Sequence, residues 1–373
     1  MKIVHVCLPS LPVLYPWGGA IQRRIFEISR NQARYGHNVL VYSIGNKRGV
    51  KIIDGIEIHY LTCCLSGPFK ALEYQIRVVL DMKKKFHDID VLHFHSIPEG
   101  AFLSTKMPAR KFLSYDYYNF HGIKKQSFFY YLYRLLILRF DFLLPCSLYC
   151  LEESKEFWKL PSRRMHVVYN GVNLNQFHPD TDLRKKERAI LGIEDKKVIL
   201  YVGRVCYQKG TDILIRAVQR LNHDEERVRL LIAGPISQFG KTYKADTWQK
   251  LISDTGGIYL GPVHEKRLPA IYNACDIFVM PTREFEMFGM AAIEAQACGK
   301  PVIASDHGGL KEVVPEECGG RFPINSDLEL ARKINLLLDN DDYYRSASKN
   351  AVENAVNYDW DIISKRLDDL YRS

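Results

Sequence analysis

The sequence lacks the cysteine spacing that builds disulfide frames or zinc sites. Its 373 residues contain nine cysteines, an odd and scattered set with no Cys-x-x-Cys pair and one adjacent pair, Cys63 and Cys64. Disulfide scaffolds of secreted proteins use even numbers of closely spaced cysteines, and structural zinc sites usually place them in short-spaced pairs. The cysteines therefore argue against both kinds of site and favour a reducing compartment.

Targeting signals and nucleic-acid-binding motifs are also missing. The first residues, MKIVHVC, carry one lysine and no long apolar core behind them, so they predict a buried strand rather than a signal peptide, and we expect a cytoplasmic protein. The net charge of +9 suits an anionic ligand, an anionic membrane or nucleic acid. Because the basic residues are dispersed and no recognition helix or aromatic RNA-binding motif is present, nucleic acid is not expected.

Short β-rich runs alternate with helical patterns along the chain. The buried-type runs are KIVHVC, HNVLVYS, VLHFHS and RKFLSY, then KVILYVG, VRLLIAG, GIYLG, DIFVMP and PVIAS. Apolar strands with helices between them are typical of parallel sheets in α/β folds. A turn signal at Asn170-Gly171 separates the two series. The sequence predicts two doubly wound Rossmann-like domains facing across a cleft, residues 1–171 and 172–357, with a C-terminal helix, residues 358–373, packing back on the first.

Two cations follow the first strand of the second domain. KVILYVG ends at Gly203 and Arg204, and Lys209 and Gly210 stand just before the next helix. Ligands of open α/β sheets bind at the carboxyl ends of the strands. Cations there suit a phosphate or diphosphate, and glycines let backbone N–H groups approach an anion closely. For a single lysine or arginine, a solvated loop is the commoner explanation.

Two glutamates flank a helix start in the stretch EFEMFGMAAIEAQAC. The helix begins near Phe288, Gly289 and Met290, and its N-terminus offers unpaired N–H groups to a diphosphate. Glu286 stands before this point, and Glu294 lies roughly 8 Å beyond it along the helix axis. This order matches a nucleotide-diphosphate-sugar, with the sugar near Glu286, the diphosphate at the helix start and the ribose near Glu294. An exposed helix glutamate is the alternative for Glu294.

These motifs resemble the donor site of retaining glycosyltransferases of family 4. Gly-Arg-x4-Lys-Gly and Glu-x-Phe-Gly-x4-Glu-Ala-x-Ala-x-Gly-x-Pro-Val follow one another in the family's order. The likeness extends to VVYNGVNLNQFHP, WGGAIQ and YDWDIISKRLDDLY, and so covers nearly the whole chain. GGAIQ also resembles a spore-coat-associated branch of the family. The resemblance implies a GT-B fold and a hexosyltransferase-type enzyme.

The resemblance also assigns roles by position. Arg204 and Lys209 match residues that hold the donor diphosphate, Glu286 matches the residue that contacts the transferred sugar, and Glu294 matches the ribose ligand. Gly19 matches a first-loop glycine whose backbone faces the donor phosphate. The other expected donor-binding residues are Gly18, Gly203, Phe288, Gly289 and Met290. A UDP- or GDP-sugar is the expected donor, with no cofactor.

The resemblance also implies a site that needs no metal. The Asp-x-Asp triplets that metal-dependent glycosyltransferases use occur before a strand or in linker and helical segments, and we interpret all four as surface pairs. They are Asp88/Asp90, Asp180/Asp182, Asp339/Asp341 and Asp359/Asp361. Arg204 and Lys209 would then neutralise the charge that builds on the leaving diphosphate.

The first domain departs from the family pattern after RKFLSY. Where family members carry a histidine, this sequence has Asp116, with His121 five residues on. Either Asp116 replaces the histidine, or the loop is shifted and His121 serves. His93 and His95 lie on one face of the strand VLHFHS. Zinc is not expected without a third ligand, so we interpret one of them as packing and His95 as a candidate cleft residue.

Two functions remain open for the chain. Sugar transfer to a glycan or lipid-linked acceptor, in surface polysaccharide, glycolipid or spore-coat glycan synthesis, is the leading interpretation. A non-catalytic nucleotide-sugar or glycan-binding protein on the same fold is the alternative that Asp116 keeps open.

The segment KKQSFFYYLYRLLILRF, residues 124–140, bears on a membrane contact. As a helix it is apolar or aromatic almost all round, yet too short and too charged at its ends to span a bilayer. Either it is buried against the first sheet, or it lies peripherally at the inner face of the cell membrane. In the second case lysines and arginines meet anionic headgroups. The residues involved would be Phe128, Phe129, Tyr130, Tyr131 and Tyr133, with Lys124, Lys125, Arg134 and Arg139.

Overall fold

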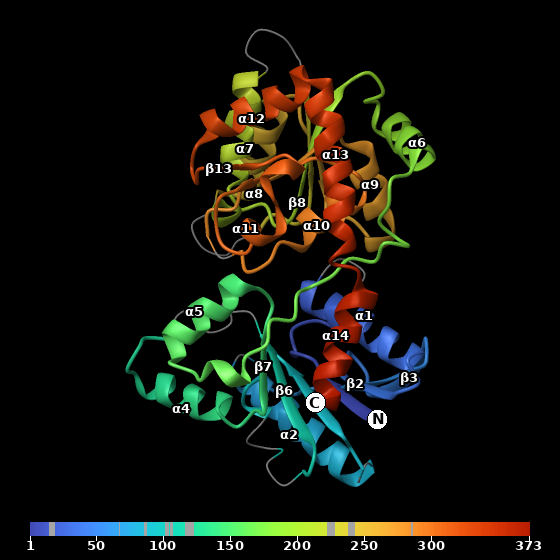
Figure 1. Ribbon diagram of the computed structural model, residues 1–373, viewed down its shortest axis with the longest axis vertical. Coiled ribbons are helices and arrows are strands. Elements are labelled where there is room, and N and C mark those ends of the chain that lie inside the picture. Colours follow the sequence, from blue (N-terminus) through green and yellow to red (C-terminus); the bar gives the residue numbers. More distant parts are fainter. Residues whose placement is uncertain are drawn as a thin grey trace. The chain divides into compact units, whose positions relative to one another are not determined.

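The structure is a computed structural model that divides into two compact units. It describes residues 1–14, 19–66, 68–85, 88–100, 104, 107–115, 123–221, 228–237, 243–284 and 286–373. Unit 1 comprises Met1–Asn170 and Trp360–Ser373, and unit 2 comprises Gly171–Asp359. Each unit is built on one sheet with helices on both faces (Figure 1). The prediction of two doubly wound α/β units is confirmed.

The sheet of unit 1 has seven strands in the order β3-β4-β2-β1-β5-β6-β7, parallel except for β3. Its centre is formed by runs that are buried on both faces, as the sequence predicted for KIVHV and VLHFH. The strands are β1 (Lys2–Val6), β2 (Asn38–Ile44), β3 (Gly49–Ile53), β4 (Ile56–Leu61), β5 (Val91–His95), β6 (Arg110–Tyr115) and β7 (Phe142–Pro145).

A hairpin at the sheet edge was not predicted. β3 pairs with β4 in an antiparallel register that places Ile52 opposite Glu57. The turn between them uses Asp54 and Gly55, both with positive φ, 51° and 78°. An Asp-Gly turn between two β-rich runs is a strong hairpin signal. The sequence therefore does contain a signal for this hairpin.

Helices cover the two faces of this sheet unequally. Right-handed crossovers place α1, which links β1 to β2, on one face, and α2 and α4, which lead toward β5 and β7, on the other. Glu99 accepts hydrogen bonds from Gln75 of α2 at 3.3 Å and from Tyr133 of α4 at 2.8 Å, so these two helices are neighbours. The helices are α1 (Ala20–Arg34), α2 (Pro68–Lys85), α4 (Phe128–Ile137), α5 (Leu148–Trp158), η2 (Ser162–Arg164) and α14 (Trp360–Arg372).

The C-terminal helix α14 packs on α1 within unit 1. Asn31 donates to Ser364 Oγ at 3.3 Å, and His37 Nε2 lies 2.6 Å from Asp368 Oδ1. Because these contacts are buried, they fix the direction of α14 as well as its position.

Unit 2 has a six-stranded parallel sheet in the order β10-β9-β8-β11-β12-β13. Its core combines both kinds of element: Ile199, Leu230 and Val279 of the sheet pack with Leu214 of α7 and Ile334 of α12. The strands are β8 (Lys197–Val202), β9 (Val228–Ala233), β10 (Ile258–Gly261), β11 (Ile277–Met280), β12 (Val302–Ser305) and β13 (Arg321–Phe322).

The helices of unit 2 fill the crossovers between these strands and then end the unit. Two of them, α12 and α13, follow the last strand, and α13 packs on α10. They are α6 (Thr181–Leu191), η3 (Tyr207–Lys209), α7 (Thr211–Leu221), α8 (Ala245–Ser253), η4 (Glu265–Arg267), α9 (Leu268–Ala274), α10 (Met290–Ala297), α11 (Leu310–Val313), η5 (Glu316–Cys318), α12 (Asp327–Asp339) and α13 (Asp341–Val356).

Candidate functional site

Two loops of unit 2 bring the predicted donor residues to one edge of the sheet. β8 and β11 are parallel neighbours, so the loop after β8 and the loop after β11 leave the sheet at the same carboxyl edge. The first loop carries Arg204 and Lys209, and the second carries Glu286 and leads into α10 at Gly289. This edge is where open α/β sheets bind ligands.

Lys209 and Glu286 form an ion pair across these loops. Lys209 Nζ donates to Glu286 Oε2 at 2.7 Å, and the two side chains are only 17% and 13% exposed. The sequence predicted that one binds a diphosphate and the other a sugar, but not that they contact each other. A partly buried pair of this kind holds a cation and a carboxylate ready, each with donor and acceptor positions left for a ligand.

Arg283 fastens the two loops together. Its guanidinium donates to the Asp212 carboxylate, with one N–O distance of 2.6 Å, and stacks 4.0 Å from the centre of the Tyr207 ring. Its backbone N–H donates to Gln208 O at 2.9 Å. Burial raises the pKa of Asp212, but hydrogen bonds from Arg283 and Arg216 outweigh burial and leave it below the usual value. The sequence does not predict this pair, because no motif links residues 71 positions apart.

Glycine is required in these loops for close packing. Gly210 has φ 67°, and a Cβ there would lie 1.9 Å from Pro281 O. Gly289, the N-cap of α10, has φ 103°, and its Cβ would lie 2.7 Å from Leu310 Cδ2. We had expected the glycines beside the cations to make room for an anion. At Gly210 the close neighbour is instead the backbone of the other loop, so this glycine brings the two loops together.

Glu294 is buried in α10. Only 4% of it is exposed, and its Oε2 accepts a hydrogen bond from Tyr272 OH at 2.8 Å. The alternative of an exposed helix glutamate is therefore wrong. Phe288 is also buried and packs edge-on against Tyr358. This contact helps to fix the position of the start of α10.

The remaining predicted donor residues differ in how far the structure describes them. Arg204 is exposed, and its backbone carbonyl accepts from Tyr201 OH at 2.7 Å. Gly19 is the N-cap of α1, with φ 113°. Gly18 lies outside the described residues, and so do Asp116 and His121.

A small hollow lies at the carboxyl edge of unit 1. Its volume is about 60 Å³, and Arg24, His95, Ser114, Tyr115 and Asn170 are among the residues that line it. Arg24 is buried and donates to Asn170 Oδ1 at 2.7 Å and to Ser114 Oγ at 3.2 Å. The lining mixes polar and apolar side chains, and Tyr115 directly precedes Asp116 in the sequence. His95 thus lines a hollow within unit 1.

His93 and His95 have a third histidine beside them, which the sequence analysis missed. His5 of β1 stands opposite His93 in the sheet register, and one ring nitrogen of each of the three lies within 4.8 Å of the others. The stated ground against zinc, the lack of a third ligand, is therefore wrong. β1 and β5 are far apart in the sequence, and only the strand order brings the three together.

Hydrogen bonds already engage most of these ring nitrogens. His5 Nε2 lies 2.7 Å from Gln32 Oε1, and His5 Nδ1 lies 3.0 Å from His95 Nε2. His93 contacts Tyr371 OH and, at 2.7 Å, Ser114 Oγ. Burial lowers the pKa of His5 to about 4 and the pKa values of His93 and His95 well below the usual value. The cluster is thus an uncharged, buried network that a metal would have to break.

Comparisons with known proteins agree with this architecture. A family model described as glycosyltransferase family 4 matches residues 17–176, and one described as glycosyl transferases group 1 matches residues 184–354. An uncharacterized glycosyltransferase of Methanocaldococcus jannaschii is 32% identical over 59% of this chain and 57% of its own length. A D-inositol 3-phosphate glycosyltransferase of Mycolicibacterium smegmatis is 34% identical over 53% of this chain and 44% of its own length.

A solved structure covers the chain from end to end. HepE of Anabaena, in complex with UDP and glucose, has a TM-score of 0.80 at 20% identity and covers 100% of both chains. The two family models follow one another along the chain, each on its own unit. The chain belongs to the group 1 and family 4 glycosyltransferases, and its fold is GT-B. It spans about half the length of the curated relatives that it matches.

The histidine network predicts that unit 1 loses stability in mild acid. His5 is neutral when folded and has the ordinary pKa of 6.5 when unfolded. Its contribution is therefore complete above pH 6.5 and is lost as the pH falls toward about 4. Between pH 7 and pH 5 this amounts to about 2 kcal/mol of unfolding free energy for His5. Urea unfolding at the two pH values measures it.

The variant His5→Gln should flatten this pH dependence, since glutamine does not titrate. His178→Gln, at an exposed position, is the matched control and should leave the slope unchanged. Equal slopes for His5→Gln and the unaltered protein would show that the network is not the source.

Proposed function

We propose that the chain is a retaining, metal-independent glycosyltransferase that moves a hexosyl group from a nucleotide-diphosphate-sugar to a hydroxyl group. The observation that carries the proposal is the Lys209–Glu286 pair, at 2.7 Å, on the carboxyl edge of the unit 2 sheet beside the start of α10. A cation and a carboxylate in contact suit the point where a phosphate joins a sugar. Membership of the family supports the same activity.

The residues fit the donor in a defined order. Arg204 and Lys209 would neutralise the diphosphate as the bond from sugar C1 to the phosphate oxygen breaks. Glu286 would accept hydrogen bonds from sugar hydroxyls, and Glu294 from ribose hydroxyls. The acceptor oxygen then forms the new bond to C1 on the face that the diphosphate leaves, and a diphosphate oxygen takes the acceptor's proton. The configuration at C1 is retained.

When no ligand is bound, the two members of the ion pair neutralise each other's charge. Lys209 has Glu286 as its partner, so the site does not hold a bare buried cation. When a diphosphate binds, Lys209 gains a second anionic partner and Glu286 becomes available to the sugar. Binding and positioning of the sugar are thereby linked through one hydrogen bond.

UDP-sugars are the first donors to test. One solved structure with the same fold contains UDP and glucose, and GDP-sugars are the second candidate. Thermal shift with UDP-, GDP-, ADP- and TDP-sugars would identify the donor, because a ligand that binds the folded state raises its apparent stability by RT ln(1 + [L]/Kd). Release of the free nucleotide in the presence of acceptor then separates a transferase from a non-catalytic binder.

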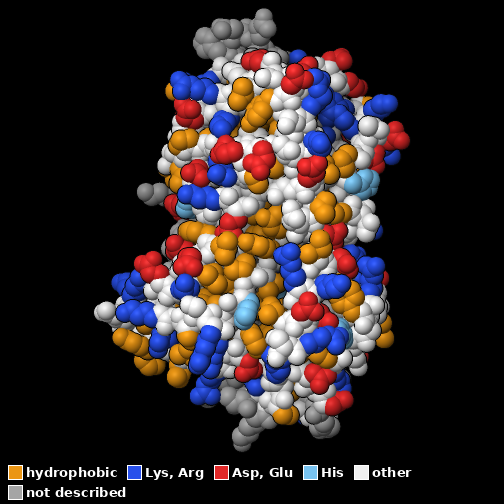
Figure 2. Space-filling view, in the orientation of Figure 1, with side chains coloured by type: hydrophobic (Ala, Val, Ile, Leu, Met, Phe, Trp, Pro, Cys, Tyr) orange, Lys and Arg blue, Asp and Glu red, His pale blue; other side chains and the backbone are white. Residues whose placement is uncertain are grey.

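A peripheral membrane contact through α4 is part of the proposal, for a lipid-linked acceptor at the inner face of the cell membrane. Among the described residues, no helix combines the length and apolarity needed to cross a bilayer. α4 instead exposes an apolar surface, the α4 patch, and Figure 2 shows hydrophobic side chains gathered over this helix with lysines and arginines beside them. The α4 patch consists of Phe128, Phe129, Tyr131, Leu132 and Leu135.

Three of the residues expected at the membrane instead point into unit 1. Tyr130 is buried and donates to Phe157 O at 2.9 Å. Tyr133 donates to Glu99, and Arg134 Nε donates to Trp158 O at 2.8 Å. Half of α4 therefore packs against the unit, as the alternative for this segment expected, and the other half is free for a membrane.

Glu286→Gln should nearly abolish transfer while the free nucleotide diphosphate still binds. The carboxylate serves the sugar, and its loss leaves Lys209 to the phosphates. Glu284→Gln, an exposed neighbour in the same loop, is the matched control and should retain activity. Initial rates and calorimetric titration with the nucleotide measure the two effects, and an equal loss of nucleotide binding in Glu286→Gln would contradict the placement.

Arg204→Ala and Lys209→Ala should each remove about 2 to 4 kcal/mol of transition-state stabilisation and so lower turnover. In Lys209→Ala, Glu286 is also left without its partner and repels the diphosphate. The double variant Lys209→Ala with Glu286→Gln should therefore bind nucleotide better than Lys209→Ala alone. Additive losses in the double variant would show that the pair is not coupled to the ligand.

Transfer should survive EDTA, because Arg204 and Lys209 supply the positive charge that a metal gives other enzymes. Initial rates are compared in excess EDTA and with Mg²⁺ or Mn²⁺ restored. Activity that stops with the chelator and returns with the ion would overturn the metal-independent mechanism.

Binding to anionic vesicles should be salt-sensitive and depend on the lysines beside the α4 patch. The double variant Lys124→Glu with Lys125→Glu should bind phosphatidylglycerol vesicles about 30-fold more weakly, because each lysine contributes about 1 kcal/mol to binding. Sedimentation with the vesicles measures this affinity. Lys365→Glu with Arg366→Glu, on α14 over the opposite face of unit 1, is the control. Unaltered protein that stays in the supernatant at low salt would remove the membrane contact from the proposal.

A further inference from the structure

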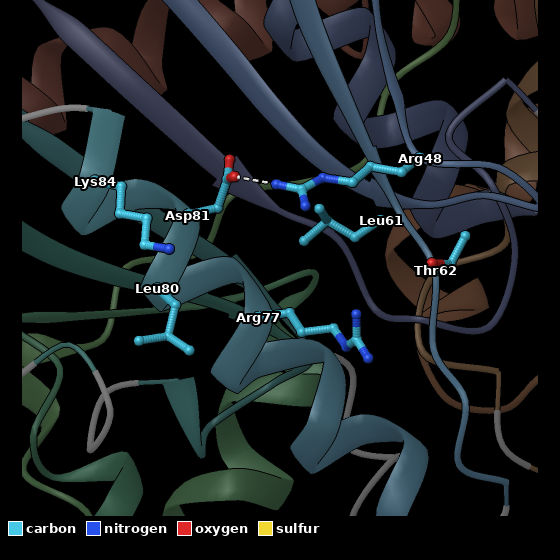
Figure 3. Close-up of a pocket in the computed structure, with 7 residues that line it drawn as sticks. All are labelled: Arg48, Leu61, Thr62, Arg77, Leu80, Asp81 and Lys84. Carbon is cyan, nitrogen blue, oxygen red and sulfur yellow. Dashed lines mark hydrogen bonds and ion pairs between the residues drawn. The ribbon is translucent and has the colours of Figure 1, made fainter.

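A second hollow in unit 1 lies between α2 and the β3–β4 hairpin, and it shares no lining residue with the hollow beside His95. Its volume is about 190 Å³, far more than the roughly 10–15 Å³ that one water molecule needs. Figure 3 shows Asp81 of α2 pointing toward Arg48, with a dashed line marking their ion pair. We call it the α2 hollow; it is lined by Arg48, Leu61, Thr62, Arg77, Leu80, Asp81 and Lys84.

The carboxylate in the α2 hollow is already neutralised. Asp81 Oδ1 lies 2.9 Å from Arg48, and Oδ2 lies 3.0 Å from Lys85 and accepts from Tyr42 OH at 2.9 Å. Burial raises the pKa of Asp81, but the hydrogen bonds from Lys85 and Tyr42 outweigh it and hold the pKa below the usual value. Asp81 thus stays ionised and holds Arg48 in place, and an anion entering the hollow meets no unbalanced negative charge.

The other two cations keep hydrogen-bonding capacity for a ligand. Arg77 Nε donates to Glu73 at 2.8 Å, and that carboxylate also accepts from the backbone N–H groups of Cys64 and Leu65. The Arg77 guanidinium has further N–H groups, one of which contacts Cys64 Sγ at 3.7 Å. The Lys84 ammonium group has no hydrogen bond or ion pair among the described residues. Three cations therefore line the hollow: Arg48 is paired with Asp81, Arg77 with Glu73, and Lys84 is left for a ligand.

An exposed apolar stripe on α2 leads into this hollow. Its spacing of three and four residues places it along one side of the helix, and it ends at Leu80, which lines the hollow. On the hairpin, Val50 and Ile52 stand opposite His59 and Glu57 in the register and are exposed. His59 lies 3.7 Å from Asp81 of α2, so this side of the hairpin faces α2. The α2 stripe consists of Phe69, Leu72, Ile76 and Leu80, which are 65%, 47%, 40% and 54% exposed.

We propose that the α2 hollow binds the phosphate group of an anionic lipid headgroup, with the α2 stripe lying in the boundary between headgroups and acyl chains. A helix with an apolar side at the surface and basic residues at its end is the arrangement that lies in a membrane interface. The three cations face the charge that such lipids carry. A free sugar phosphate would match the cations but not the exposed stripe.

This surface shares a face of unit 1 with the α4 patch. α2 and α4 are neighbours through Glu99, so a membrane at the α2 stripe would lie close to α4. The inference deepens the proposed membrane contact, but its test is independent of sugar transfer, since the α2 hollow includes none of the donor residues. A failed lipid test would leave the donor-site proposal standing.

The test compares two adjacent lysines of α2 in the full chain. Lys84 lines the α2 hollow, whereas Lys83 is exposed beside it and does not. Lys84→Gln and Lys83→Gln remove the same charge from the same helix, so diffuse attraction to a membrane falls equally. Binding to phosphatidylcholine vesicles with and without phosphatidylglycerol is measured by flotation. We expect Lys84→Gln to bind about five-fold more weakly than Lys83→Gln, the factor given by about 1 kcal/mol for one specific contact.

Equal losses in the two variants would overturn the proposal, since they would leave only diffuse attraction. Phe69→Ser with Leu72→Ser should reduce binding to both vesicle types, and unchanged binding would also count against it. Glycerol 1-phosphate is the soluble comparison. If it raises the melting temperature of the unaltered protein but not of Lys84→Gln while vesicles fail to bind, the hollow serves a soluble phosphate and the lipid proposal is wrong.

Discussion

The buried ion pair between Arg283 and Asp212 is the constraint on which the candidate donor site depends. Both side chains are less than a tenth exposed, and Arg283 belongs to the loop after β11 while Asp212 opens α7. Removing one partner of such a pair typically costs about 3–5 kcal/mol, because a buried charge is left unpaired. The pair holds the loop after β11 against α7. The Lys209–Glu286 contact then forms between two segments whose positions are already fixed.

The close approach of the two backbones completes this arrangement. Gly210 is where the loop after β8 touches Pro281 O, and no residue with a Cβ fits there at positive φ without moving one of the loops. Ion pairing and glycine packing therefore act on the same two segments. A donor bound at this edge would meet a preformed set of groups rather than separate flexible loops, which lowers the entropy cost of binding.

Much of the fold followed from the sequence because its central strands are apolar on both faces. Runs such as KVILYV and VRLLIA have that pattern, and both are strands. Two edge strands were not predicted. β13 has two residues, too few for any periodicity, and β7 has four and closely follows the apolar segment 124–140. The β3–β4 hairpin was overlooked, although Asp54-Gly55 signals it.

The candidate site was predictable only where a local motif marks it. Lys209 and Glu286 each stand in such a motif, but their contact joins residues 77 positions apart and depends on β8 lying beside β11. His5 was missed for the same reason, since its position beside His93 depends on β1 lying beside β5. Strand order is set by packing of the whole sheet, and so contacts across it are the part that local sequence patterns do not contain.

The two faces of unit 1 differ in a way that suits an enzyme with a membrane-held acceptor. α14 covers one face and joins α1 through buried polar contacts, whereas α2 and α4 leave apolar residues exposed on the other. Leu61 and Thr62 of the α2 hollow stand at the carboxyl end of β4, and His95 and Tyr115 stand at the carboxyl ends of β5 and β6. These strands run parallel through β2 and β1. A lipid held at the α2 surface would therefore present its headgroup at the same edge of the sheet as the hollow beside His95.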